Sequence, residues 1–245
     1  MLLTIDIGNT KIKCAVFEQN TLVEKFIFDQ NEGVIFFKKI FKKFNSIQFS
    51  IASSVGKLEK ECLDYLEKHS KLTVVSHKIS FPFENLYKTP TTLGIDRMVL
   101  ATGACLSFPK TNCLIIDAGT CITYDFLNDK GQYFGGAISP GLQLRYKSLH
   151  NYTAKLPLLE KENINFFMGQ NTNESMHSGI INGIVHEIEG FISQYFLKYQ
   201  HLTIILTGGD ADFLAKRLKS TIFANSNFLL ESLNLLFNYV QTQND

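Results

Sequence analysis

The sequence predicts an α/β protein made of two similar lobes with a cleft between them. Residues 2–10 and 113–120 resemble each other, since each has a buried strand that ends at an acidic residue and a small-residue turn. After each segment the sequence predicts the same order of three strands, a helix, a strand and a helix, with some variation. A duplication of this length indicates two related lobes, which we expect at residues 1–110 and 111–245.

In the first half, alternating apolar residues predict strands at 2–7, 11–18 and 21–28. Apolar residues at helical spacing predict a helix over 32–44, in which the lysines Lys38, Lys39, Lys42 and Lys43 form the solvated face. A strand at 48–53, a helix at 56–69 and a short strand at 71–76 follow. A loop containing Pro82 and Pro90 then leads into a helix at 94–108.

The second half begins again with three strands, at about 113–117, 121–127 and 132–138. A helix is expected at 140–150, and a long helix at 175–200 with an apolar stripe. A buried strand at 202–206 leads into the turn Thr207-Gly208-Gly209, and helices at 212–218 and 228–240 complete the chain. No low-complexity segment interrupts this order.

Composition narrows the classes of function. The formal net charge of +1 gives no electrostatic reason to expect nucleic acid or an anionic membrane as a partner. The five cysteines show no CxxC spacing, which favours small buried thiols in a reducing compartment over zinc sites or disulfides. No apolar run approaches the roughly 20 residues of a membrane span, and no signal peptide fits, so we expect a cytoplasmic protein.

The two duplicated turns are the strongest candidates for a functional site. Each offers a carboxylate, a glycine and a hydroxyl at the end of a strand: Asp6, Gly8 and Thr10 in the first, Asp117, Gly119 and Thr120 in the second. A buried carboxylate is unfavourable unless a cation or hydrogen-bond donors pair with it, and magnesium bound to phosphates would supply that cation. Two such hairpins could hold a phosphate chain, although an ordinary hairpin turn explains either one alone.

Further candidates lie outside the hairpins. Asp96 could accept a proton from a substrate hydroxyl and Arg97 could bind an anion, although both could instead serve only the start of a helix. The turns at 135–141 and 207–211 could allow a ligand to approach the backbone, or could simply connect elements. Thr172 or Asn173 is expected to cap the long helix.

These residues together resemble type III pantothenate kinases, bacterial enzymes of the acetate and sugar kinase/Hsp70/actin superfamily. The resemblance covers nearly the whole chain and rests on the order and spacing of several motifs: Asp6-Ile7-Gly8-Asn9-Thr10, Tyr87 before Gly94-Ile95-Asp96-Arg97, Asp117-Ala118-Gly119-Thr120, Gly135 to Gly141, Asn171-Thr172 with Ser175-Met176, and Thr207-Gly208-Gly209. One departure is Leu230-Glu231-Ser232-Leu233, where the family commonly has a Leu-Gly or similar pair.

The resemblance implies two ribonuclease H-like (actin-type) lobes with mixed five-stranded sheets and an interlobe cleft. It implies transfer of the γ-phosphoryl group of ATP to pantothenate, the first step of coenzyme A synthesis, with Mg²⁺ and a monovalent cation, K⁺ or NH₄⁺. It also implies a homodimer.

The resemblance assigns these roles residue by residue. Asp96 would be the catalytic base, and Asp117 would bind the monovalent cation. ATP would contact Asp6, Ile7, Gly8, Asn9, Thr10, Lys11, Ile12, Lys13 and Thr120, and Asp6 would help place magnesium. Pantothenate would contact Tyr87, Gly94, Ile95, Asp96, Arg97 and Thr172.

Other functions remain open at this stage. A non-catalytic accessory or regulatory protein of the same family could retain both hairpins, although the presence of Asp6, Asp96 and Asp117 favours an enzyme. Another small-molecule kinase of the superfamily would normally carry a different acceptor motif at 94–97.

Overall fold

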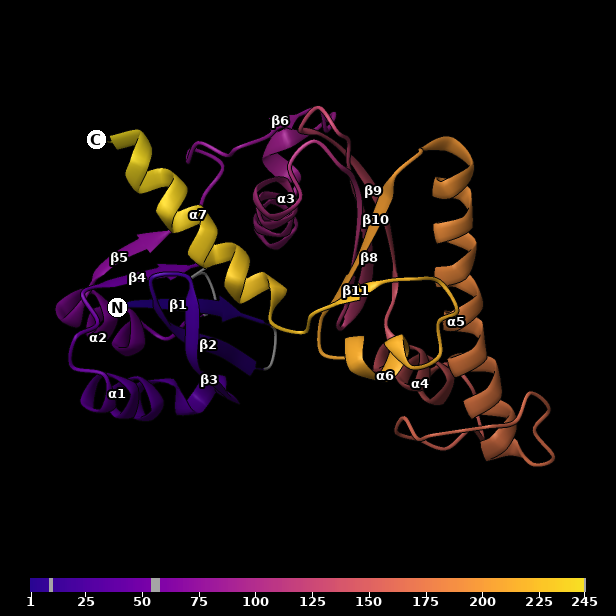
Figure 1. Ribbon diagram of the computed structural model, residues 1–245. Helices are drawn as coiled ribbons and strands as arrows, with labels where there is room; N and C mark the ends of the chain where they lie inside the picture. Colours follow the sequence, from indigo (N-terminus) through magenta and orange to yellow (C-terminus); the bar gives the residue numbers. More distant parts are fainter. Residues whose placement is uncertain (9–10, 54–57, 245) are drawn as a thin grey trace. The chain divides into compact units, whose positions relative to one another are not determined.

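The chain folds into two compact units, shown in Figure 1. The computed structural model describes residues 1–8, 11–53 and 58–244. Unit 1 consists of Met1–Pro109 together with Asn227–Asp245, and unit 2 consists of Lys110–Ser226. Each unit has its own mixed sheet with helices packed on it, which confirms the predicted α/β class with two lobes.

The sheet of unit 1 has the strand order β3-β2-β1-β4-β5. The strands are β1 (Leu2–Ile7), β2 (Lys11–Glu18), β3 (Thr21–Asp29), β4 (Phe49–Ala52) and β5 (Lys71–Val74). β1 is central, since it pairs antiparallel with β2 and parallel with β4. The end of β1 therefore lies between two neighbouring strands, where Asp6 is held on both sides.

Helices cover both faces of this sheet. Alternate residues of β1 point to opposite faces, so Leu3 and Ile5 pack toward α1 (Gly33–Lys43) and α2 (Lys60–His69), while Leu2 packs toward α7 (Phe228–Asn244). The third helix of the unit, α3 (Ile95–Ser107), contributes Val99 to the α7 side. Three short elements complete unit 1: η1 (Gln30–Glu32), β6 (Glu84–Asn85) and η2 (Pro90–Thr92).

The predicted helices of unit 1 are largely confirmed. The four lysines of α1 are exposed, as expected of its solvated face. α2 begins at Lys60, later than the predicted residue 56, and residues 56–57 lie outside the described part of the chain.

In unit 2, residues 110–226 contribute five strands in the order β11-β10-β7-β8-β9. These are β7 (Asn112–Ala118), β8 (Cys121–Leu127), β9 (Gln132–Pro140), β10 (Leu202–Thr207) and β11 (Phe223–Ala224). β7 again lies centrally, antiparallel to β8 and parallel to β10. The first three strands of each unit therefore repeat the same antiparallel meander, as the duplicated motifs predicted.

One face of this sheet is covered by helices α4 (Leu142–Asn151), α5 (Thr172–Lys198) and α6 (Ala211–Ala215), and in Figure 1 α5 runs along the strands. The covered face supplies Leu114, Ile116 and Tyr124, and α5 supplies a stripe of isoleucines at 180, 181, 184, 188 and 192. This confirms the predicted apolar stripe of the long helix. α6 ends at Ala215, before the predicted residue 218.

The last helix belongs to unit 1, whereas the sequence analysis placed all of 111–245 in the second lobe. The reason lies in its apolar residues: Leu230, Leu233, Leu236 and Phe237 pack with Leu2, Phe17 and Ile51 of the first sheet. The chain therefore returns to its first unit after completing the second. No helix within the described ranges 1–8, 11–53 and 58–244 is long and apolar enough to cross a membrane.

Candidate active site

Asp6 stands near the end of β1 at the start of a closed hairpin. The Gly8 backbone N–H donates to the Lys11 carbonyl at 3.0 Å, which closes the turn between β1 and β2. A second element supports the turn, because the Gln30 side-chain amide donates to the Gly8 carbonyl at 2.5 Å. Asn9 and Thr10, both predicted to contact nucleotide, lie outside the described residues.

Three groups set the electrostatics of Asp6. Burial raises the pKa of this carboxyl group above its ordinary value, and the charge of Asp96 raises it further. Lys13, directly across the ladder from Asp6, and a 3.0 Å hydrogen bond from the Ser53 hydroxyl lower the pKa without offsetting the rise. Unit 1 thus brings Asp6 and Asp96 close enough to repel each other, in a setting that favours a bound cation.

Asp96 lies in the first turn of α3, just after Gly94. Its carboxylate folds back over the helix start, where Oδ1 accepts from the Arg97 N–H at 2.8 Å. A Cβ at Gly94 would lie 2.4 Å from that Oδ1, so the absence of a side chain at 94 makes room for the carboxylate. The motif 94–97 therefore fixes the direction of an acidic group at the N-terminus of a buried helix.

Arg97 is almost buried, with 6% of its surface exposed, and its guanidinium carbon lies 5.7 Å from the centre of the Tyr87 ring. Two predicted substrate residues are therefore in contact. The segment before Gly94 is held by His77, whose Nε2 lies 2.9 Å from the Leu93 carbonyl. Ile95 packs its side chain toward the α7 side of the core.

Not every residue of the first hairpin offers a side chain to a ligand. Ile12 is fully buried in the core beside α1, and Ile7 packs against the same cluster. Lys11 is exposed at the start of β2. Of these three, only Lys11 has a side chain free to reach an anion.

In unit 2, Asp117 occupies the corresponding place near the end of β7. Thr123 of β8 and Thr207 of β10 are its partners across the two ladders, so all three side chains share one face of the sheet. The hydroxyl oxygens of Thr123 and Thr207 are both buried, and neither has a hydrogen-bond partner. Such groups are unfavourable unless a ligand or ion satisfies them.

Two other turns press closely on the 117–120 turn. Gly208 has φ +97°, and a Cβ there would lie 2.4 Å from the Ala118 carbonyl and 2.5 Å from Asp117 Oδ1. Gly141 donates its N–H to the Thr120 carbonyl at 3.0 Å, and a Cβ there would lie 2.1 Å from the Gly119 carbonyl. The glycine-containing motifs at 119, 141 and 208 thus assemble around Asp117, and Thr120 remains exposed.

Thr172 is the first residue of α5 and is exposed. The cap of this helix is Asn171, whose side chain accepts from the Glu174 N–H at 3.0 Å, so the prediction that Thr172 or Asn173 is the cap was wrong. The side chain of Thr172 therefore does not cap α5.

The preceding loop, residues 152–171, is fastened at several points. Lys161 forms an ion pair with Asp210, Arg217 donates to Asn163 Oδ1 at 2.7 Å, and Glu162 lies 3.3 Å from His177 Nε2. Asp210 in turn donates its backbone N–H to the Ala118 carbonyl at 2.9 Å. The loop that leads to Thr172 is thus tied to the turn beside Asp117.

Known proteins resemble this chain over nearly its whole length. The family model described as type III pantothenate kinase matches residues 2–194. The chain is 54% identical to the type III pantothenate kinase of Flavobacterium johnsoniae, over 98% of each chain. It is 48% identical to that of Christiangramia forsetii, over 99% of this chain and 100% of the relative.

The chain belongs to the type III pantothenate kinase family.

Solved structures show the same fold for this pantothenate kinase family member at low sequence identity. A Baf-family protein from Campylobacter jejuni superimposes with a TM-score of 0.65 at 21% identity, covering 99% of this chain and all of that one. The activator of 2-hydroxyisocaproyl-CoA dehydratase from Clostridium difficile gives a TM-score of 0.56 at 11% identity, over 99% and 96% of the two chains. These similarities support the actin-type architecture of the two lobes.

The side chains around Asp6 in this pantothenate kinase family member suit a divalent cation that takes most of its ligands from the bound nucleotide. Within the described residues, no three His, Cys, Asp or Glu side chains gather as a protein-only metal site. Asp6, desolvated and repelled by Asp96, offers one hard oxygen ligand, which is typical of magnesium that keeps phosphate and water as its other ligands.

Three supporting residues escaped the sequence analysis: Ser53, Gln30 and His77. Ser53 follows a buried strand in a run of small residues, which is the only local signal of its role. Gln30 and His77 are distant in sequence from the groups they hold, and nothing in their neighbourhoods marks them.

Proposed function

We propose that this protein transfers the γ-phosphoryl group of ATP to the primary hydroxyl of pantothenate, giving 4'-phosphopantothenate for coenzyme A synthesis. The observation that carries the proposal is that the chain belongs to the type III pantothenate kinase family, and the nearness of Asp6 and Asp96 within unit 1 supports it. The first carboxylate suits the nucleotide and the second suits the acceptor.

Asp96 is the proposed base. Its carboxylate takes the proton of the pantothenate hydroxyl while the hydroxyl oxygen bonds to the γ-phosphorus, and the bond from that phosphorus to the bridging oxygen of ADP breaks. The proton then resides on Asp96 until solvent removes it. The hydrogen bond from the Arg97 backbone N–H to Asp96 Oδ1 holds the carboxylate in one orientation for accepting the proton.

Phosphoryl transfer depends on alignment and charge neutralisation more than on covalent chemistry. The turn at 6–13 is the proposed cradle for the ATP phosphates, with the N–H groups of the turn and the charges of Lys11 and Lys13 as donors. Asp6 would hold magnesium, which neutralises phosphate charge when bound. Thr120 of unit 2 is the proposed second contact for the nucleotide.

Arg97 and Tyr87 are the proposed anchors of pantothenate, together with Gly94, Ile95 and Thr172. Pantothenate carries a carboxylate, and an almost buried guanidinium pre-oriented by an aromatic ring suits that group. Thr172 supports this reading because its hydroxyl is exposed and does not cap its own helix.

Asp117 is the proposed ligand of a monovalent cation, K⁺ or NH₄⁺. Support comes from the two buried, unpartnered hydroxyl oxygens of Thr123 and Thr207 on the same sheet face. A carboxylate with neutral oxygens suits a weakly hydrated cation. A homodimer and a cytoplasmic location are further parts of this proposal, and they rest on the family.

The test is a direct assay of the purified protein with ATP, magnesium, potassium and pantothenate, in which 4'-phosphopantothenate is measured by mass spectrometry. Asp96→Asn is expected to lower kcat by about 10²- to 10⁴-fold while leaving ATP affinity near its original value. The control is Asp64→Asn, which alters an exposed acid on α2 and should leave turnover unchanged. Near-normal turnover of Asp96→Asn would exclude it as the base.

A second arm omits potassium. Activity should fall without the monovalent cation, and Asp117→Asn should abolish the response to added potassium. If the wild-type protein makes no phosphopantothenate with all components present, the accessory-protein alternative is favoured.

A further inference from the structure

A cluster of aromatic side chains lines a cavity of unit 2 that plays no part in the proposed reaction. The cavity measures about 410 Å³, and four rings line it: Phe126 of β8, Phe134 of β9, and Tyr195 and Tyr199 at the end of α5. Phe126 stacks on Tyr199 with 4.1 Å between ring centres and lies 5.2 Å from Tyr195. The rings are therefore held in place by one another.

Glycine backbone without side chains lies beside these rings. Gly135 and Gly136 of β9 line the same cavity, and Gly135 has φ +96°, a conformation that glycine adopts readily. Phe134 keeps 48% of its surface exposed. The exposed face of Phe134 beside glycines that carry no side chain suits a flat ring, which stacks on Phe134 and lies against the glycines.

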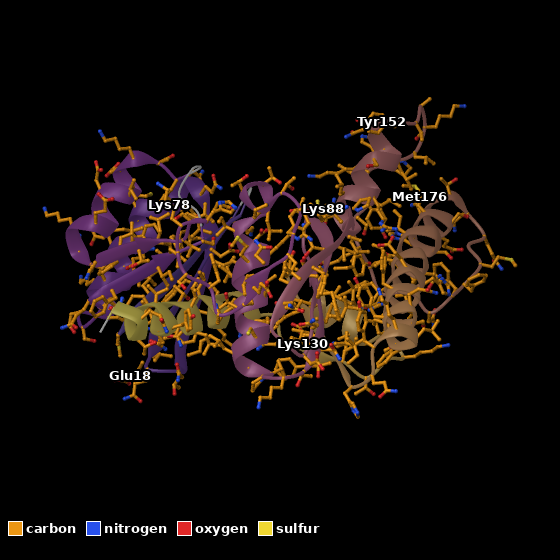
Figure 2. All side chains as sticks on the ribbon, turned by 90° about the horizontal axis from the view of Figure 1, so that it is seen from above. Glu18, Lys78, Lys88, Lys130, Tyr152 and Met176 are labelled. Atoms are coloured by element: carbon orange, nitrogen blue, oxygen red, sulfur yellow. The ribbon has the colours of Figure 1, made fainter. Side chains whose placement is uncertain are left out.

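A polar cavity of about 510 Å³ adjoins the aromatic one, and Lys198 and Tyr199 line both. Its basic residues are Lys110, Lys130, Lys198 and His201, against one acid, Asp129 (Lys130 is labelled in Figure 2). The surroundings therefore favour an anion.

The backbone around the polar cavity is unusual. Lys110 and His201 both adopt positive φ, +57° and +50°, a conformation that non-glycine residues rarely take. His201 immediately precedes β10, and Lys110 lies two residues before β7. Asn112 fixes the cavity floor, since its side chain donates to the Gln200 carbonyl at 2.9 Å and accepts from the Asp129 N–H at 3.1 Å.

We propose that the two cavities together form a second ligand site, which takes a planar aromatic ring carrying a phosphate group, as in a nucleoside monophosphate. The ring stacks on the exposed face of Phe134 beside Tyr199, with buried Phe126 supporting Tyr199 from behind, and the phosphate meets the basic residues of the polar cavity. The carboxyl end of α5 carries partial negative charge, which would repel a phosphate group. The positive charge of Lys198, at the junction of the two cavities, offsets that repulsion.

This site is separate from the proposed active site. β7 and β10 are parallel; their amino ends border the polar cavity, whereas Asp117 and Thr207 lie at their carboxyl ends. From Asn112 to Asp117 the strand spans roughly 17 Å at about 3.3 Å per residue. Figure 1 shows the junction of α5 and β10 at the end of the sheet away from α6.

The sequence offers a clean reporter, because the chain contains no tryptophan. In Phe134→Trp the single tryptophan lines the aromatic cavity, and AMP is expected to quench its fluorescence saturably at millimolar concentrations. Adding Lys198→Met should weaken the apparent affinity by about fivefold, as expected for one exposed charge pair. Inorganic phosphate should compete with AMP without quenching.

The matched control is Phe196→Trp, since Phe196 lies on the same helix end, is 49% exposed and lines neither cavity. It should show no saturable quenching. Equal quenching in both reporters, no response in Phe134→Trp, or an unchanged affinity after adding Lys198→Met would each overturn the proposal.

Kinase assays separate this site from the active site. Lys198→Met in the otherwise unchanged protein should keep the wild-type KM for ATP when AMP is absent. A raised KM would show that Lys198 serves the reaction itself and would overturn a separate site. Failure of the protein to phosphorylate pantothenate would leave the fluorescence result intact, so the two proposals can fail independently.

Discussion

At the scale of single residues, Asp6 combines a proposed functional position with a cost to stability. Its folded-state pKa is raised, chiefly by burial, so the ionised carboxylate destabilises the folded chain at pH values above that pKa. Asp6→Asn removes the charge and keeps an oxygen for Ser53. We therefore expect Asp6→Asn to raise the midpoint of urea unfolding at pH 7 while abolishing magnesium-dependent ATP binding.

The pH dependence distinguishes this cause from a change in packing. The advantage of Asp6→Asn should shrink as the pH falls through the raised pKa toward the unfolded value, because the wild-type carboxyl is then protonated in both states. Asp64→Asn, at an exposed position, should show no such trend. A variant less stable than wild type at pH 7 would mean that attraction to Lys13 outweighs desolvation.

At this scale the sequence indicated candidate residues of the proposed site but not the residues that support them. An aspartate two residues before a glycine, at the end of a buried strand, marks both Asp6 and Asp117, and its occurrence in both halves of the chain favours a ligand-binding turn over an ordinary one. The approach of Asp96 to Asp6 depends on how α3 packs, which local pattern does not encode. Ser53 shows the same limit, since β4 brings it beside Asp6 only through sheet pairing.

At the scale of elements, α3 and α7 approach closely at Gly103. A Cβ there would lie 1.8 Å from the buried Ser232 hydroxyl oxygen and 2.8 Å from its Cβ. Gly103→Ala is therefore expected to destabilise the protein by about 1–3 kcal/mol, because overcrowding outweighs the better helix propensity of alanine. Urea unfolding measures the change.

The control is the same substitution at Gly183, in the middle of α5, where an added Cβ would meet no atom within 4 Å. Gly183→Ala should stabilise by up to about 1 kcal/mol from helix propensity alone. If both variants gain stability, α3 and α7 can move apart freely and the close packing has no energetic consequence.

A second prediction at this scale concerns Glu187 of α5, which joins three elements. It accepts from Tyr124 of β8 at 2.8 Å, from Ser139 of β9 at 2.5 Å and from Arg145 of α4 at 2.6 Å. Burial raises the pKa of Glu187, but these hydrogen bonds outweigh burial and leave the pKa lowered. Its stabilisation is therefore present above the unfolded pKa and is lost as the pH falls through the folded value.

Glu187→Gln should lower the free energy of unfolding at pH 7 by about 1–3 kcal/mol, since Arg145 loses its charged partner. The difference from wild type should narrow in acid, below about pH 4. Glu160→Gln changes an exposed glutamate and should have little effect at either pH. A constant difference across the pH range would assign the loss to packing instead of charge.

At the scale of the whole molecule, the return of α7 to unit 1 is the feature that sequence reasoning could not assign. The helix itself was predicted, because its leucines recur at helical spacing. That spacing shows that one face is buried but not which sheet buries it. The partners Leu2 and Phe17 lie more than two hundred positions earlier in the chain, so proximity in sequence favoured the wrong lobe.

Truncation after Ser226 tests this division directly. Loss of α7 would expose Leu2, Phe17, Ile51 and Val99, which form one side of the unit 1 core, while the core of unit 2 contains no residue beyond 226. Amide hydrogen exchange followed by mass spectrometry should then show lost protection across residues 1–109 and retained protection across 110–226. The control is truncation after Val240, which keeps the packed leucines and Phe237 and should preserve both units. If protection disappears from residues 110–226 as readily as from 1–109, the two units do not fold as separate cores.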